Sequence, residues 1–180
     1  MSESLSGTSV FVTGADGFIG SHLVEALVSR GARVRALVYY NSWNHNGWLS
    51  DIDPSILKEV ELIPGDVRDT ETIRSGVKGC EYVFHLSSLI GIPYSYKAPR
   101  SYVDTNIGGA LNIFEACRAS DSLSRLLHVS TSEVYGSAQT VPISETHPIV
   151  GQSPYSATKI AADKLAESYH LSFGLPVVTA

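Results

Sequence analysis

Short, mainly apolar runs alternate with helix-like segments along almost the entire chain. The runs that we predict as strands are 9–12, 34–38, 60–64, 82–85, 126–130 and 177–179. Between them, segments with helical periodicity occupy 21–29, 70–77, 102–119 and 155–172. Strands that are apolar on both faces need helices on both sides of the sheet, so the pattern predicts a parallel α/β sheet. Because crossovers between parallel strands are right-handed, we expect a doubly wound, Rossmann-like topology.

The length and composition fit one soluble domain that occupies 1–180. The net charge of −5 includes no basic block, so nucleic acid is not an expected partner. No apolar run approaches the ~18 residues that a membrane helix needs, and the polar start at 1–9 carries no secretion segment. Cys80 and Cys117 are far apart and are predicted to be buried thiols in a reducing compartment, so we expect a cytoplasmic protein.

A run of glycines follows the first strand and opens the first helix. It reads Gly14-Ala15-Asp16-Gly17-Phe18-Ile19-Gly20. Glycines at such a turn permit positive φ and a close approach of the backbone to a ligand. The helix N-terminus offers free N–H groups and the positive end of a dipole to a pyrophosphate. The strand–turn–helix context therefore favours dinucleotide binding over a plain tight turn, although the spacing is G-x-x-G-x-x-G rather than G-x-G-x-x-G.

The second strand gives no clear preference between NAD and NADP. An acid is expected about 20 residues beyond the glycine turn to hold the adenosine ribose of NAD, but this strand ends in YYN (39–41). No arginine follows the strand, as a 2′-phosphate would favour, and Arg33 and Arg35 can simply face solvent. The stretch 39–50, which holds two tryptophans, is predicted to be a loop, and Gly31 is expected to end the first helix.

The third and fourth strands end in residues suited to a cofactor. Asp66 is placed to accept a hydrogen bond from the adenine amino group, or else to cap the helix at 70–77. Small residues in Leu86-Ser87-Ser88 would let the diphosphate and ribose pass close by. His85 is predicted to be a satisfied strand-end histidine, and the six histidines show no metal-ligand spacing, so no metal is expected.

Tyr155 and Lys159 are four residues apart at a predicted helix start, where Ser153 can cap the helix and Pro154 fits its first turn. Residues i and i+4 share a helix face, so the ammonium can lie near the phenol. A positive neighbour lowers the pKa of a tyrosine, which can then act as a general base. The pair would follow the fifth strand, beside the expected nicotinamide.

The fifth strand is followed by Thr131, Ser132 and Glu133. Ligands of open α/β sheets bind at the carboxyl ends of the strands. Two hydroxyls and a carboxylate would therefore point to where a substrate lies. The alternative is that these residues cap the strand and turn the chain.

Together these motifs resemble the extended short-chain dehydrogenase/reductase family, the NAD-dependent epimerase/dehydratases. The resemblance covers 8–179 and rests on GADGFIG (14–20), GDVRD (65–69), VFHLSS (83–88), YVDTNIGGALNIFEA (102–116), STSEVYG (130–136) and SPYSATK (153–159). It implies a homodimer through the helices 102–119 and 155–172. It also implies cofactor contacts from Gly14, Asp16, Gly17, Phe18, Ile19, Gly20, Asp66, Val67, Leu86, Ser87, Ser88, Asn106, Tyr155 and Lys159.

Within the family, Thr131-Ser132-Glu133 resembles the triplet of GDP-mannose 4,6-dehydratases. The segments YNSWNHNGWLS (40–50) and IGIPYSY (90–96) look like the 4,6-dehydratases of the legionaminic-acid type, which act on GDP- or UDP-linked N-acetylglucosamine. The alternatives are a nucleotide-sugar 4-epimerase or decarboxylase, and a non-catalytic dinucleotide-binding fragment. Family members continue well beyond a sixth strand, so we expect 1–180 to be the dinucleotide-binding domain without its C-terminal substrate-binding part.

The resemblance implies a redox-neutral dehydration of the sugar. Tyr155 would remove the proton of the 4-hydroxyl, aided by Lys159 and Thr131, while a hydride passes to the nicotinamide. Glu133 would remove the proton on carbon 5, water would leave from carbon 6, and the hydride would return there. Ser132 stands where the dTDP-glucose enzymes place an aspartic acid, which leaves the proton donor to the leaving hydroxyl open.

Overall fold

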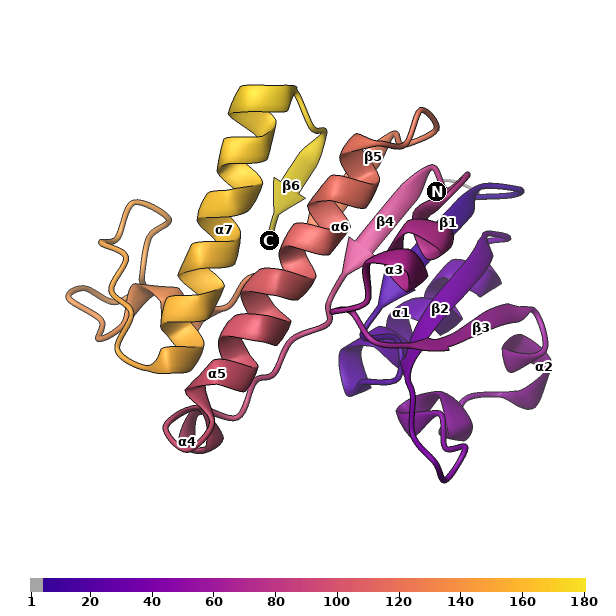
Figure 1. Cartoon of the computed structure of the whole chain (residues 1–180), viewed down its shortest axis with the longest axis horizontal. Helices are drawn as coiled ribbons and strands as arrows, with labels where there is room; N and C mark the ends of the chain where they lie inside the picture. Colours follow the sequence, from indigo (N-terminus) through magenta and orange to yellow (C-terminus); the bar gives the residue numbers. More distant parts are fainter. Residues whose placement is uncertain (1–4) are drawn as a thin grey trace.

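A computed structural model of the chain describes residues 5–180, so residues 1–4 of the polar start lie outside it. All the strands form one six-stranded parallel sheet with the order β3-β2-β1-β4-β5-β6 (Figure 1). The strands are β1 (Ser9–Thr13), β2 (Arg33–Tyr39), β3 (Val60–Gly65), β4 (Tyr82–His85), β5 (Arg125–His128) and β6 (Val177–Thr179). The strand order reverses between β1 and β4, which confirms the predicted doubly wound topology.

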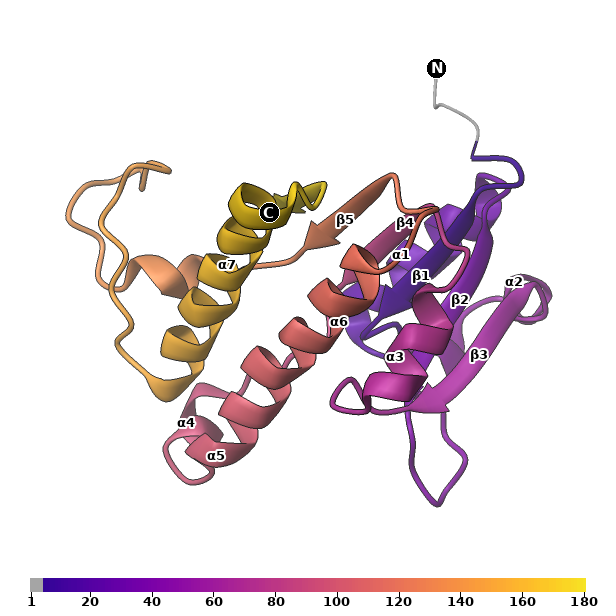
Figure 2. The same cartoon turned by 45° about the horizontal axis from the view of Figure 1, so that its top comes forward.

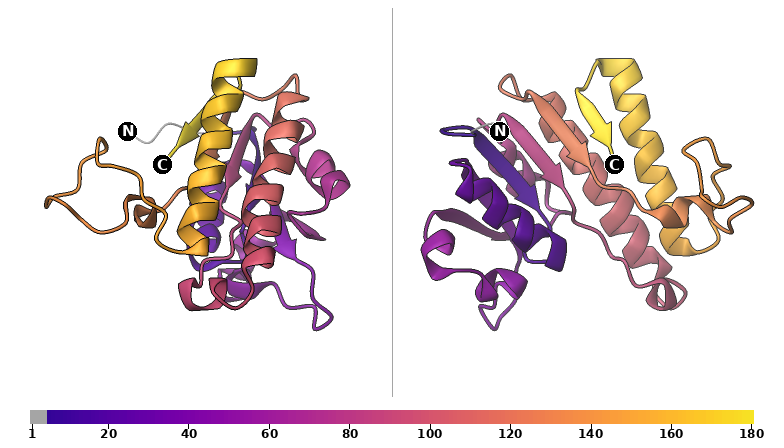
Figure 3. Two further views of the ribbon diagram at one scale, coloured as in Figure 1. Left: turned by 60° about the vertical axis from the view of Figure 1, so that its left-hand side comes forward. Right: turned by 180° about the vertical axis from the view of Figure 1, so that it is seen from behind.

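The helices cover the sheet in two groups. They are α1 (Phe18–Ser29), η1 (Gly47–Asp51), α2 (Pro54–Leu57), α3 (Thr70–Val77), α4 (Ile92–Ser95), α5 (Pro99–Tyr102), η2 (Val103–Gly108), α6 (Gly109–Arg118), η3 (Ser132–Tyr135) and α7 (Pro154–Phe173). Figures 2 and 3 show α3, α6 and α7 against one face, and α1 with η1 and α2 against the other. Among residues 5–180, no helix has the length and apolar character to cross a bilayer.

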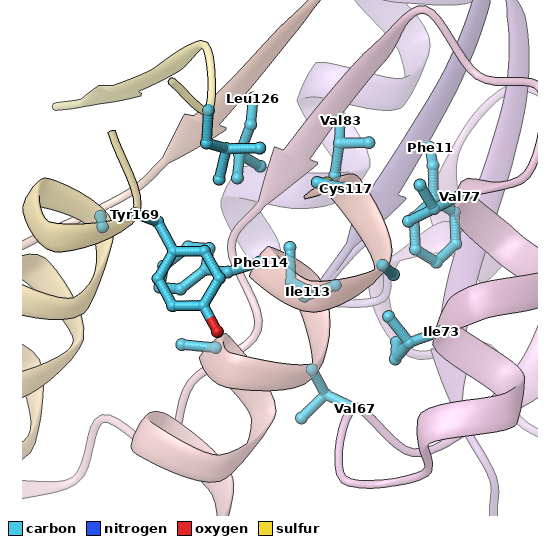
Figure 4. Close-up of a cluster of buried hydrophobic side chains, with 14 of the residues drawn as sticks. Phe11, Val67, Ile73, Val77, Val83, Ile113, Phe114, Cys117, Leu126 and Tyr169 are labelled. Atoms are coloured by element: carbon cyan, nitrogen blue, oxygen red, sulfur yellow. The ribbon is translucent and has the colours of Figure 1, made fainter. Parts of the chain in front are cut away.

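Alternate residues of the strands feed two separate hydrophobic cores. On β1, Phe11 points to the face under α3, α6 and α7, while Val10 and Val12 point to the face under α1. Figure 4 shows the first core, in which Phe114 lies between the strands and Tyr169 of α7. Because both faces of the central strands are buried, the middle residues of β1 and β4 are apolar on both faces, as the sequence pattern predicted. Cys80 and Cys117 are free thiols within this first core, and burial raises the pKa of Cys117 to about 12.

Several predicted boundaries move. The predicted helix 102–119 is one continuous rod that begins at Pro99 and contains a π-helical stretch, Val103–Gly108. The first helix starts at Phe18 rather than at Ser21, because Gly17 already serves as its N-cap. The predicted loop 39–50 is partly regular, since η1 begins within it. The fifth strand ends at His128, two residues earlier than predicted.

Two adjacent glycines in the long rod provide a matched test of close packing. Gly108 and Gly109 share helical backbone angles, near φ −62° and −61° with ψ −44°. A Cβ on Gly109 would lie 2.7 Å from Cγ1 of Val67, whereas the nearest atom to a Cβ on Gly108 is 4.0 Å away.

We therefore expect opposite signs in urea denaturation. Gly108→Ala should raise the free energy of unfolding by about 0.5–1 kcal/mol, because alanine loses less backbone entropy in a helix. Gly109→Ala should lower it by about 1–3 kcal/mol through overpacking. Equal effects of the two substitutions would contradict the close approach of this helix to Val67.

Candidate active site

The carboxyl ends of the strands open into one crevice of about 850 Å³. Most of the residues predicted to bind a cofactor line it: Gly14, Asp16, Gly17, Phe18, Ile19, Gly20, Asp66, Val67, Leu86, Ser87, Ser88, Tyr155 and Lys159. Thr131 lines it as well. The crevice lies where the strand order reverses, which is where open α/β sheets bind their ligands.

The backbone of the glycine turn is packed too tightly for a side chain at Gly14 or Gly20. Gly14 has φ +68°, and a Cβ there would lie 2.9 Å from the backbone of Leu86 and Ser87. A Cβ on Gly20 would overlap the carbonyl oxygen of Gly14. The backbone is thus exposed to the crevice at the N-terminus of α1, where no side chain caps the first N–H groups. This cradle of free N–H groups at a helix start fits a pyrophosphate.

At the other side of the turn, Asp66 and Arg68 line the crevice as a bidentate ion pair. Arg68 lowers the pKa of Asp66 through this hydrogen bond. Helix α3 is capped by Asp69, not by Asp66, so the helix-cap interpretation of Asp66 is wrong. The Asp66 carboxylate therefore does not cap α3, and it lines the crevice.

Tyr155 and Lys159 lie on the first turns of α7. Ser153 and Ser156 form a reciprocal capping box around Pro154, which sets the start of the helix as predicted. The ring of Tyr155 packs edge-on against Tyr102, 6.3 Å between centroids. Lys159 donates a hydrogen bond of 2.6 Å to the carbonyl oxygen of Val129, just beyond β5. Burial lowers the pKa of Lys159, and the nearby Asp163 carboxylate opposes that shift.

The triplet after β5 forms a short 3₁₀ turn that packs against α7. Thr131 caps this turn by accepting a hydrogen bond of 3.3 Å from the N–H of Glu133. Ser132 and Glu133 are exposed and do not line the crevice. The structure therefore brings Thr131, Tyr155 and Lys159 together and leaves the other two side chains outside the cavity wall.

Asn106 has a different position from the other predicted cofactor residues. It is buried behind the crevice, where its amide bonds both the N–H and the carbonyl oxygen of Leu89, at 2.8 and 3.0 Å. It also donates to Oγ1 of Thr158 on α7. Asn106 thus fixes the segment after β4 against α7 and does not reach the crevice wall.

A buried polar cluster beneath Lys159 escaped the sequence prediction. His128 bonds Oδ1 of Asp163 at 3.1 Å, and Ser130 donates to Oδ2 of the same carboxylate at 2.5 Å. His85 stacks on His128 and bonds Oγ1 of Thr13, so it is a satisfied strand-end histidine as predicted. The available signal was Asp163 itself, an acid four residues after Lys159 on the buried face of a helix.

Several further residues line the crevice although they do not belong to the predicted set, among them Tyr39 and Arg68. No group of three or more His, Cys, Asp or Glu side chains placed to hold a metal occurs within residues 5–180.

Comparison with known proteins finds both nucleotide-sugar dehydratases and nucleotide-sugar epimerases. The family described as GDP-mannose 4,6 dehydratase matches residues 11–180. UDP-glucuronate 4-epimerase 1 of Arabidopsis thaliana is 34% identical over 176 residues, which cover 95% of this chain and 41% of that protein. A dTDP-glucose 4,6-dehydratase of Xanthomonas campestris pv. campestris (strain B100) is 34% identical over 182 residues, which cover 93% of this chain and 50% of that protein.

A solved structure has the same fold. It is a mutant of UDP-glucuronic acid 4-epimerase from Bacillus cereus in complex with UDP-4-deoxy-4-fluoro-glucuronic acid and NAD. It superposes with a TM-score of 0.85 at 29% identity and covers 96% of this chain and 55% of that one. The chain thus spans about half the length, or less, of these similar proteins.

Because of the stacked histidines His85 and His128, we expect the free energy of unfolding to depend on pH. Burial, together with His128 and Lys159, holds the pKa of His85 well below its usual value, and burial also lowers the pKa of His128. Below about pH 6.5 the unfolded chain binds protons that the folded chain does not, so stability falls as the pH drops.

Urea denaturation should show a loss of up to about 2 kcal/mol per fully depressed histidine between pH 7.5 and 5.0. His85→Gln should flatten this dependence. His22→Gln, which changes an exposed histidine, should leave it intact. An unchanged slope in His85→Gln would show that other groups cause the pH dependence.

Proposed function

Since the chain belongs to the GDP-mannose 4,6-dehydratase family, we propose that it is the NAD-binding and catalytic part of a nucleotide-sugar 4,6-dehydratase. The crevice supports NAD as the cofactor, because the glycine turn would hold its pyrophosphate and Asp66 would accept from its adenine amino group. Ser87 and Ser88 would line the path of the diphosphate and ribose. Tyr155 and Lys159 would then lie beside the nicotinamide.

The chemistry that NAD supplies when bound is reversible storage of a hydride. Tyr155 acts as the general base that takes the proton of the sugar 4-hydroxyl as carbon 4 is oxidised to a ketone. Lys159, four residues after Tyr155, brings a positive charge to the same face of α7 and lines the same crevice. Thr131 adds a hydroxyl at the crevice wall that can hold the sugar oxygen.

The remaining steps need a second base. Once carbon 4 is a ketone, Glu133 takes the acidified proton of carbon 5, and the carbon 6 hydroxyl leaves as water with one added proton. A hydride at carbon 6 and a proton at carbon 5 then complete a 4-keto-6-deoxy product, so the net change is the loss of one water. Ser132 stands beside Glu133, and it is the nearest hydroxyl to that carboxylate in the chain sequence.

One observation supports dehydration most directly. Glu133 is exposed outside the crevice wall, but it lies two residues after Thr131 of that wall, on a turn that packs against the helix bearing Tyr155 and Lys159. A 4-epimerase needs no such second base, because it only removes and returns hydrogen at carbon 4. The similarity to UDP-glucuronate 4-epimerases makes epimerisation of a nucleotide sugar the second candidate.

We further propose that two copies pair through the helices predicted for this purpose, 102–119 and 155–172. Their outer faces carry exposed apolar side chains, among them Val103, Leu111 and Leu171. Exposed apolar surface on adjacent helices favours association.

The cofactor assignment predicts a thermal shift for this chain. NAD⁺ at 100 times its dissociation constant should add about 2.7 kcal/mol of stability, because it binds only the folded state. Inorganic pyrophosphate at the same concentration is the control for a simple anion effect. The absence of any shift with NAD⁺ would remove the basis of the catalytic assignment.

The dehydration assignment predicts a separation of two chemical steps. In the full-length protein, Glu133→Gln should lower 6-deoxy product formation by about 10²–10⁴-fold, because a general base is lost. Reduction of the cofactor should continue, since Tyr155 is intact. Tyr155→Phe is the matched control and should block both steps.

Product mass distinguishes the candidates. Loss of one water supports dehydration, an unchanged mass indicates epimerisation, and loss of carbon dioxide indicates decarboxylation. Full dehydration by Glu133→Gln would remove Glu133 from the mechanism.

A further inference from the structure

Strand β2 ends without the acid that a NAD site usually places there. Its last residue is Tyr39, followed by Tyr40 and Asn41. In related folds a carboxylate at this strand end accepts a hydrogen bond from the adenosine 2′-hydroxyl. This chain needs another source for that acceptor if it binds NAD, as the proposed function requires.

The carboxylate of Asp16 occupies this strand end although it comes from the glycine turn. Its Oδ2 accepts a hydrogen bond of 3.0 Å from the N–H of Tyr39. Its backbone oxygen accepts one of 2.9 Å from the N–H of Trp48. A Cβ on Gly47, which has φ +57°, would overlap that same oxygen. Asp16 is therefore clamped between the end of β2 and the start of η1.

The loop between these two contacts is itself well organised. Asn41 donates to the carbonyl oxygens of Tyr39 and His45 and accepts from the N–H of His45. His45 accepts from the N–H of Gly47 through Nδ1. The edge-on contact of Trp48 with Phe18, 5.2 Å between centroids, ties the loop to α1. The Asp16 carboxylate is thus held in place by a folded loop.

The charge of Asp16 is not neutralised by a neighbour. It is half-buried in the crevice wall, and within residues 5–180 it forms no ion pair and Oδ1 has no hydrogen-bond partner. Arg68, which also lines the crevice, is already paired with Asp66. Arg35 bonds Glu61 and the carbonyl oxygen of Lys78, so it is also engaged elsewhere. The adenosine end of the crevice therefore has a net negative charge.

We propose that Asp16 is the residue that selects NAD over NADP: Oδ1 accepts a hydrogen bond from an adenosine ribose hydroxyl, and the carboxylate repels a 2′-phosphate. A like charge held against a dianionic phosphate is strongly unfavourable, whereas a hydroxyl gains a charge-assisted bond. The acid that β2 lacks is supplied by the turn beside it.

The test compares Asp16→Asn with the unaltered chain. Asparagine keeps an oxygen that can accept from the Tyr39 N–H, so the loop contact is preserved while the charge is lost. Titration calorimetry should give the dissociation constants of NAD⁺ and NADP⁺, and of 5′-AMP and adenosine 2′,5′-bisphosphate, which probe the adenosine end alone. Asp121→Asn, an exposed acid in the turn before β5, is the control for net charge.

The unaltered chain should prefer NAD⁺ by at least about tenfold, and Asp16→Asn should shrink that ratio by at least about tenfold while Asp121→Asn leaves it unchanged. Both tryptophans of the chain, Trp43 and Trp48, lie in the clamped loop, so their fluorescence reports whether it stays folded. An unchanged ratio in Asp16→Asn overturns the inference, and so does a changed ratio that comes with altered emission, because the loop would then be the cause.

The test separates this inference from the proposed function. If the chain binds NAD⁺ but Asp16→Asn leaves the ratio of the NADP⁺ and NAD⁺ dissociation constants unchanged, the selectivity alone is refuted and the proposed function stands. A chain that binds neither dinucleotide refutes both.

Discussion

The crevice exists because three backbone segments approach more closely than side chains would allow. Gly14 touches the chain after β4, Gly20 touches Gly14, and Gly47 touches Asp16. Each contact is short enough that a single added carbon would force the segments apart. The start of α1, the end of β4 and the loop after β2 are therefore fixed relative to one another. These three close backbone contacts therefore fix the positions of the groups that could hold a dinucleotide.

The part of the crevice lined by Tyr155 and Lys159 is held by a different kind of contact. Asp163 on α7 accepts from His128 and Ser130 at the end of β5, and Lys159 reaches the carbonyl oxygen of Val129 in the same stretch. These bonds link the helix that carries Tyr155 to the strand that precedes Thr131. Such buried polar groups are costly unless they are satisfied, so they specify one register of the helix against the strand. The spacing of the proposed base and the Thr131 hydroxyl follows from that register.

The sequence predicted the sheet well because both faces of its central strands are buried. All six strands and the four long helical segments were located from apolar runs and helical periodicity. The segments α2 and α4 were missed because four residues are too few to show a helical period. The position of Asp16 at the end of β2 was also out of reach, since it depends on a contact across 23 residues of chain. The burial of Asn106 behind the crevice depends likewise on its partners in another segment, Leu89 and Thr158.

The turn that bears Thr131, Ser132 and Glu133 contributes little to the hydrophobic cores, since Val134 is its one buried side chain. Substitutions at Ser132 and Glu133 would therefore cost the fold almost nothing. The side chains of this turn can therefore vary without disturbing the sheet and helices that build the crevice. Proteins named as an epimerase and as a dehydratase are both 34% identical to this chain, so one sheet and crevice are shared by relatives with two different reactions.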